Sequence, residues 1–222
     1  MDSVQRVRIE YSKKGPIRYI GHLDLMHTFF RALKRANLPV SYTQGFNPHI
    51  KCSFSPALPL GFASESEYME LYLDKKIDIS SSIGNLQREL PEGLTVHNMG
   101  KLPLFGRSNN VKIKAVAYRI NLRQFYGKST VSDPVTREDI EGKIRNFLDK
   151  EEIFLIDKKR RRVNVRPLIV SMKMERNWDI RLLLKAGGGF NFNPGIIIKT
   201  LLGVEKEELS FIEFTREKFL FW

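Results

Sequence analysis

The fold is first indicated by residues 7–37, which read VRIEYSKKGPIRYIGHLDLMHTFFRALKRAN. Alternating apolar residues, beginning with Val7 and Ile9, predict a β-strand over residues 7–20 that is interrupted near Gly15-Pro16. In residues 23–37 the apolar positions recur every three or four residues, which is typical of an amphipathic helix. This part of the chain is therefore predicted to form a strand followed by a helix.

The pattern continues toward the middle of the chain and is then repeated. A Gly-Phe-Asn-Pro turn separates two short extended pieces, and alternation, helical periodicity and further alternation follow in turn. The predicted elements after this turn are a strand at 67–73, a helix at 79–90 and a strand at 94–99. The first half therefore has the order βαββαβ.

The second half has the same predicted order. Its elements are a strand at 111–122, a helix at 136–148 with a capping box from Thr136 to Asp139, paired strands at 163–174 and 178–184, a helix at 194–202 and a strand at 209–221. The polar segment 106–110 is the predicted boundary. We therefore predict an α+β fold of two tandem ferredoxin-like (βαββαβ) units with antiparallel sheets, residues 1–105 and 111–222, without a residue-level repeat.

The charge balance indicates a polyanionic partner. The 222 residues include 37 Lys and Arg but only 25 Asp and Glu, which gives a formal net charge of +12. Nucleic acid is the first candidate and a membrane surface the second. No apolar run reaches the roughly 18 residues that span a bilayer, and residues 1–20 lack a signal-peptide core, so we expect a cytoplasmic protein without membrane contact. The single cysteine, Cys52, excludes an internal disulfide framework and a Cys-rich metal site.

Two segments of the first half carry candidate nucleic-acid-binding residues. The predicted first helix has a basic stripe of His27, Arg31, Lys34 and Arg35, which is either a phosphate-binding face or an ordinary solvated face. The loop 44–51 offers Gln44, Asn47, His49 and Lys51, which can bind an anion or a base edge. The alternative is that Asn47-Pro48 only forms a turn.

A second cationic segment lies in the other half. Residues 158–162 read KKRRR, and we expect a hairpin tip or loop that contacts a polyanion. Farther on, Gly187-Gly188-Gly189 precedes Asn193-Pro194, where a helix start could bind phosphate, although a glycine-rich bend explains these residues more simply. The remaining residues of the predicted binding set are basic: Lys13, Lys14, Arg18, Lys158, Lys159, Arg160, Arg161, Arg162 and Arg166.

Candidate catalytic residues are few. His22 and Asp24 lie at the predicted strand-to-helix junction and, with His49, could serve acid–base chemistry. A lone histidine is more often structural, and Asp24 also suits the positive end of a helix dipole. The histidines have no paired spacing that is typical of metal ligands, so we predict neither a metal nor a cofactor.

Several short motifs resemble a known family. Gly21-His22-Leu23-Asp24, Gln44 to His49, Leu58-Pro59-Leu60-Gly61, Ser66-Glu67-Tyr68 and Val165-Arg166-Pro167 look like the pattern of the radical SAM-linked domain, a bacterial domain of unknown function fused to or encoded beside radical SAM proteins. The likeness covers the first third of the chain well and the rest thinly. Gly21 stands where Ser is expected, and Asn164 stands where Asp is usual before Arg-Pro.

The resemblance implies a radical SAM protein as partner and a role in RNA modification or ribosome-related work. This chain lacks the three-cysteine motif of a radical SAM cluster, so such chemistry would belong to a separate polypeptide. The favoured hypothesis is an accessory protein that binds tRNA or rRNA. The alternatives are a metal-independent RNA-processing or RNA-modifying enzyme, which we rank lower, and a protein-interaction module with an acidic partner.

Overall fold

The computed structural model describes residues 3–106, 113–127, 135–157, 160–186 and 192–221. The chain divides into two units, Met1–Lys112 and Ile113–Trp222, each with its own strands and helices. The predicted α+β class is therefore confirmed, with antiparallel pairing in both units. Most of the predicted boundary, residues 107–110, lies outside the described residues. None of the helices in the described ranges is long and apolar enough to span a membrane.

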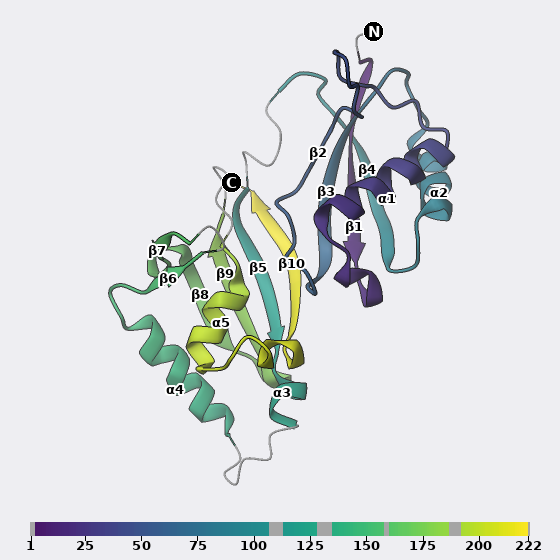
Figure 1. Ribbon diagram of the computed structural model, residues 1–222. Helices are drawn as coiled ribbons and strands as arrows, with labels where there is room; N and C mark the ends of the chain where they lie inside the picture. The colour runs from purple at the N-terminus through teal and green to yellow at the C-terminus, as the bar shows by residue number, and fades with distance from the viewer. Residues whose placement is uncertain (1–2, 107–112, 128–134, 158–159, 187–191, 222) are drawn as a thin grey trace. The chain divides into compact units, whose positions relative to one another are not determined.

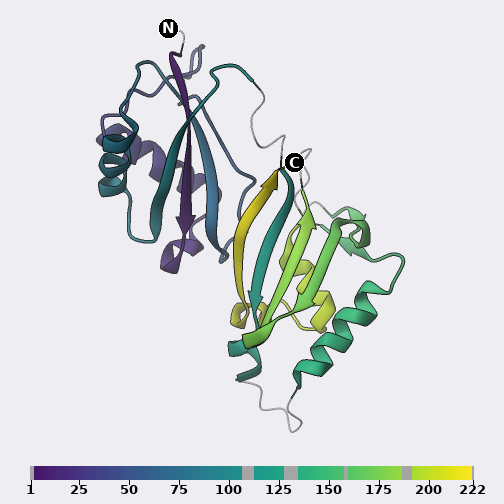
Figure 2. The same ribbon diagram turned by 180° about the vertical axis from the view of Figure 1, so that it is seen from behind.

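The first unit is a four-stranded antiparallel sheet with helices on one face (Figures 1 and 2). The strand order is β4-β1-β3-β2. Its elements are β1 (Gln5–Lys13), η1, a 3-10 helix (Gly15–Tyr19), α1 (His22–Arg35), β2 (Cys52–Phe54), β3 (Ala63–Leu73), α2 (Ile79–Glu89) and β4 (Leu94–Leu102).

The core of this unit lies between the sheet and its helices. Val7, Ile9 and Tyr11 alternate along β1 and are all buried, as the strand period requires. The ring centroid of Tyr11 lies 4.6 Å from that of Phe29, one of the buried residues of α1. The apolar face of α1 therefore packs on β1, and its opposite face is left to solvent.

The first strand is shorter than predicted. Residues 7–20 do not form one strand, because β1 ends at Lys13 and residues 15–19 form η1. Gly15 has a φ of 66°, and Pro16 fixes the first turn of the 3-10 helix, so the extended chain cannot continue. The backbone N–H of Gly61 donates to the carbonyl of Arg18 at 3.0 Å, which fastens η1 to the loop before β3.

The second unit has a sheet of the same strand order and a separate hairpin. Its sheet runs β10-β5-β9-β8 with antiparallel pairs, and β6 pairs with β7. Helices α4 and α5 lie on one face (Figures 1 and 2). The elements are β5 (Ile113–Asn121), α3 (Arg123–Gly127), α4 (Arg137–Leu148), β6 (Phe154–Ile156), β7 (Arg162–Asn164), β8 (Ile169–Met174), β9 (Asp179–Lys185), α5 (Pro194–Leu202) and β10 (Glu213–Phe221).

Helix starts in this unit follow the sequence closely, and two strands do not. The capping box of Thr136 and Asp139 is confirmed, and α5 begins at Pro194 as predicted. The predicted strand 163–174 is instead two strands, because Pro167 lies in a 3-10 helix between β7 and β8. The closing strand starts at Glu213 rather than at 209, since residues 208–211 form another 3-10 helix.

Candidate nucleic-acid interface

The exposed face of α1 carries the predicted basic stripe. His27, Arg31, Lys34 and Arg35 are all exposed, while the opposite face is buried. Arg35 is held by α2, because its Nε lies 2.7 Å from Oε2 of Glu89 and its Nη2 donates to the Glu89 carbonyl at 2.6 Å. No carboxylate of the described residues pairs with Arg31 or Lys34. These two cations are therefore available for phosphate contact.

The loop between α1 and β2 is an ordered hairpin. Tyr42 pairs with Ile50 in an antiparallel bridge. The Thr43 N–H donates to the His49 carbonyl at 2.8 Å, and the His49 N–H donates to Oγ1 of Thr43 at 3.0 Å. The Lys51 N–H donates to the Ser41 carbonyl at 2.8 Å. Residues 41–51, which we call the tip hairpin, are therefore held by main-chain and side-chain hydrogen bonds.

The predicted polar groups lie at the exposed end of the tip hairpin. Gln44, Asn47 and His49 are exposed, and the Lys51 ammonium lies 4.7 Å from the centroid of the Tyr72 ring. Amide, imidazole and ammonium groups are thus presented together from one short segment. Phe46 lies among these groups and was not in the predicted binding set. An aromatic residue between turn residues could have indicated it.

The 3-10 helix η1 contributes further cationic groups. Lys14 is exposed, and the Arg18 guanidinium lies 4.9 Å from the centroid of the Tyr19 ring and donates to its hydroxyl at 2.9 Å. The Tyr19 ring is itself exposed. A cation stacked on an exposed aromatic ring can contact both a phosphate and a base.

Lys13, a member of the predicted binding set, is buried. Its side chain is only 1% exposed, and its ammonium donates to the carbonyls of Ile20, at 2.9 Å, and Arg18, at 3.4 Å. Burial lowers the pKa of Lys13, and the nearby Glu67 carboxylate acts in the opposite direction. Lys13 ends β1 with its side chain buried, so it stabilises the turn before α1 and does not face solvent.

The candidate catalytic residues come from two elements, His22 and Asp24 from α1 and His49 from the tip hairpin. The His22 ring packs edge-on against Phe54, with centroids 5.8 Å apart. Asp24 is exposed in the first turn of α1, where an acidic residue suits the helix dipole. Positions two apart on a helix point in different directions, and His49 lies in the tip hairpin. Among the described residues there is no group of three or more potential metal ligands.

Residues of the family-like motifs make structural contacts in both units. Gly61 has a φ of 83°, a backbone conformation in which an L side chain would be strained, although a Cβ there would meet Cε1 of Tyr19 at an ordinary 3.5 Å contact. Ser66 donates to Oε1 of Glu10 at 2.8 Å. In the second unit, Oδ1 of Asn164 accepts from the N–H groups of Ile153 and Arg166. An amide oxygen thus makes contacts at 164 that need no carboxylate.

The cationic run of the second unit lies at a hairpin, as predicted. Lys158 and Lys159 lie outside the described residues. Arg161 pairs with Asp157 at 2.6 Å, and the Arg162 guanidinium lies 4.1 Å from the centroid of the Phe154 ring. Arg160 is exposed.

Arg166, unlike the exposed Arg160, makes a half-buried structural contact. Its Nε donates to the Leu148 carbonyl at 2.8 Å and its side chain is half-buried, so it ties the chain after β7 to the end of α4. We therefore count it as structural, together with Lys13.

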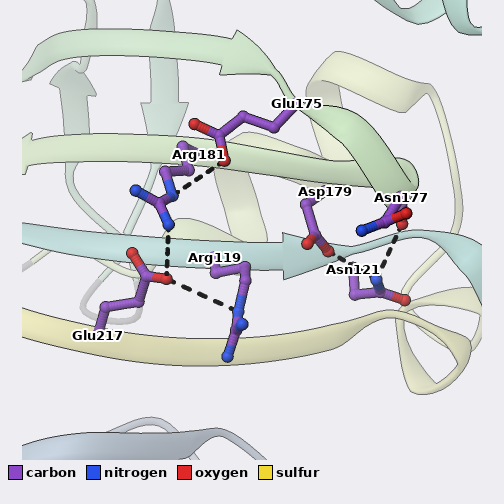
Figure 3. A network of polar contacts seen from close by, with 7 residues as sticks. All are labelled: Arg119, Asn121, Glu175, Asn177, Asp179, Arg181 and Glu217. Atoms are coloured by element: carbon purple, nitrogen blue, oxygen red, sulfur yellow. Dashed lines mark hydrogen bonds and ion pairs between the residues drawn. The ribbon is translucent and has the colours of Figure 1, made fainter.

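A charged network that the sequence analysis missed lies on the sheet of the second unit (Figure 3). Lys173, Arg181 and Arg119 are direct cross-strand neighbours on β8, β9 and β5. Glu217 lies 3.7 Å from Nε of Arg119 and 3.5 Å from Nη2 of Arg181, and Glu175 lies 3.1 Å from Nε of Arg181.

The carboxylates offset the repulsion of like charges placed directly opposite each other. These residues alternate with the buried apolar residues of the same strands, so they lie on the sheet face away from the core. Their adjacency depends on strand pairing between distant segments and could not be read from local spacing.

Comparison with known proteins assigns the chain to a bacterial family. A search of curated proteins found no match. A solved structure, described as "Crystal Structure of an Unknown Protein from Galdieria sulphuraria", aligns over 97% of this chain and 98% of that chain, with 10% identity and a TM-score of 0.27, which is too low to support an argument. Residues 6–194 match the family described as "Uncharacterized protein conserved in bacteria (DUF2344)", a description that names no radical SAM protein. Because this match spans most of the chain, the protein belongs to that bacterial family.

Proposed function

We propose that this protein binds tRNA or rRNA in the cytoplasm and acts as an accessory to an RNA-modifying enzyme. The observation that carries the proposal is the pair of exposed cations on α1, Arg31 and Lys34, which no described carboxylate pairs with. Each phosphate that a cation contacts releases condensed counterions, so a surface of this kind favours nucleic acid at moderate salt. Lys14 and Arg18 extend the proposed contact surface within the first unit, and Arg160 and Arg162 form a separate proposed contact surface in the second unit.

We also propose that the two units are tandem ferredoxin-like folds. When the separate β6–β7 hairpin is left out, the strand order within each unit is fourth, first, third, second, and a main helix follows the first and third of these strands. That order supports two tandem ferredoxin-like units. Four-stranded sheets of related design bind RNA in many proteins, which is an analogy of fold and not a reading of this site.

The enzyme partner in the proposal is a radical SAM protein. It is supported by the motif resemblance described above and by the single cysteine, which leaves no three-cysteine cluster within these 222 residues. Copurification of the two proteins at physiological salt would support this part. Failure to copurify would remove the partner and leave RNA binding to be judged separately.

RNA binding is tested by fluorescence anisotropy with labelled tRNA and rRNA fragments between about 50 and 200 mM salt. We expect affinity to fall linearly on logarithmic axes. The Arg31→Gln, Lys34→Gln double variant should reduce the slope by about 1.4 to 1.8, since each lost phosphate contact removes about 0.7 to 0.9.

The matched control is the Lys75→Gln, Lys76→Gln double variant, which removes the same charge from exposed positions between β3 and α2. Its slope should remain close to that of the unmodified protein. Equal losses in both double variants would show that only net charge matters, and no measurable RNA binding would overturn the proposal in favour of the acidic-protein partner. Turnover of RNA that disappears in His22→Ala without loss of binding would instead favour the enzyme alternative.

A further inference from the structure

The tip hairpin carries an aromatic ring that contributes nothing to the core. The exposed fraction of the Phe46 side chain is 105% of its reference value, the highest among the exposed large hydrophobic residues of the described chain. An exposed phenylalanine forgoes the stabilisation that burial would provide. Exposed apolar side chains are common singly, so a binding role for Phe46 depends on how the hairpin presents it and on the groups around it.

The hairpin presents this ring in a defined place. The Tyr42–Ile50 bridge and the Thr43–His49 hydrogen bonds hold the two arms, and Ile50 is buried against the core. Gly45 has a φ of 121°, a backbone conformation that favours glycine, directly before Phe46. Because the arms are fixed, little chain entropy is lost when the ring contacts a ligand.

The chemistry around the ring suits a nucleotide. Residues 41–51 include Lys51 and His49 but no acidic residue. Gln44 and Asn47 flank the turn with amide groups, which can donate to and accept from a base edge. A hydrophobic pocket in a protein partner would require an apolar rim around Phe46, and the Gly45-Phe46 pair is instead flanked by the exposed polar residues Gln44 and Asn47.

We propose that Phe46 stacks on an unpaired base of the bound RNA, so that the tip hairpin selects single-stranded or loop regions over continuous duplex. This inference rests on the proposed RNA binding and names its substrate class. A base in a duplex is already stacked on both faces, whereas a base in a loop has a face that an aromatic ring can cover. The amide groups of the hairpin then contact the edge of the same base.

The test compares two RNA probes, a hairpin with an unpaired loop and a fully paired duplex of equal length. The unmodified protein should bind the loop probe more tightly. Phe46→Ala should lose about 5- to 150-fold of that affinity, the range that corresponds to one base stacked on an aromatic side chain, while duplex binding and the salt slope remain unchanged. Phe105→Ala is the control, because Phe105 is 87% exposed in a different segment.

Two further variants separate stacking from insertion into an apolar pocket. Phe46→Trp should keep loop binding and show fluorescence quenching by the loop probe, after subtraction of the signal from the native tryptophans. Phe46→Leu should lose loop binding, because it is apolar but has no π-face. Retention of loop binding by Phe46→Leu with loss by Phe46→Trp would overturn the stacking inference, because an apolar side chain without a π-face would then be sufficient.

The remaining outcomes are also decisive. If Phe46→Ala binds both probes as the unmodified protein does, base stacking is wrong and RNA binding stands. If the unmodified protein binds neither probe, the proposed function and this inference fail together. Unchanged unfolding curves for the variants confirm that a loss of affinity is not a loss of fold.

Discussion

Replacing Lys13 by methionine separates a structural lysine from a binding lysine. Methionine has a similar length but no donor, so the Ile20 carbonyl, which accepts from Lys13 at 2.9 Å, loses that bond. The Arg18 carbonyl keeps the 3.0 Å bond from the Gly61 N–H. The substitution therefore removes one important hydrogen bond from the turn that leads into α1.

The expected magnitude follows from that contact. Leaving a buried acceptor without a partner costs about 1 to 3 kcal/mol. Removing a buried charge relieves part of its desolvation, the effect that lowers the pKa of Lys13. We therefore expect Lys13→Met to lower the free energy of unfolding by about 1 to 2 kcal/mol.

Urea denaturation followed by circular dichroism measures this loss, with Lys14→Met as control. Lys14 is exposed, so its substitution should change stability by less than about 0.5 kcal/mol. The effects on RNA binding should be reversed: Lys14→Met lowers the salt slope and Lys13→Met does not. Unchanged stability in Lys13→Met, or a salt slope reduced as much as in Lys14→Met, would refute the reasoning.

Three other predictions concern stability and reactivity. Gly93→Ala should cost about 2 to 4 kcal/mol in urea denaturation, since φ is 89° and the new Cβ would overlap a backbone carbonyl, whereas Gly84→Ala, in open space on α2, should be neutral or stabilising; equal effects would contradict this. Thr136→Ala should destabilise by about 1 kcal/mol through loss of the helix cap. Hydrogen bonds from Thr136 lower the pKa of Asp139, so this carboxylate stabilises the fold above about pH 4 and loses its effect as the pH falls through the lowered pKa; an acid titration in which the parent and variant differ equally at every pH would contradict this. Burial raises the pKa of the Cys52 thiol to about 11, so its reaction with a disulfide reagent at pH 8 should be much slower than that of a small thiol, and a comparable rate would show an exposed, unperturbed thiol.

Local periodicity was sufficient for the helices and insufficient where proline or pairing decides the structure. The apolar spacing located α1 within two residues at each end, and capping chemistry located the start of α4. Pro167 lies in a 3-10 helix where alternation predicted a continuous strand, and the predicted interruption at Pro16 is a 3-10 helix after which the strand does not resume. Proline restricts φ and removes a donor, so it ends a strand that the side-chain pattern alone would extend.

The site was predictable in part. The exposed stripe of α1 and the polar tip hairpin follow from residue type and spacing. The burial of Lys13 could not be foreseen from alternation, because Ser12 and Lys13 are both buried and the pairing with β3 shifts register between Tyr11 and Lys13. The row formed by Arg119, Arg181 and Lys173 could not, since it depends on the register of three strands that are separated in sequence.

RNA crosslinking in cells followed by sequencing tests the central claim most directly. The intact protein is compared with a variant in which Arg31, Lys34, Arg160 and Arg162 are replaced by glutamine. We predict enrichment of one tRNA or rRNA region that disappears in the variant at equal protein abundance. No enrichment above background, or the same enrichment in the variant, would contradict RNA binding through these cationic surfaces.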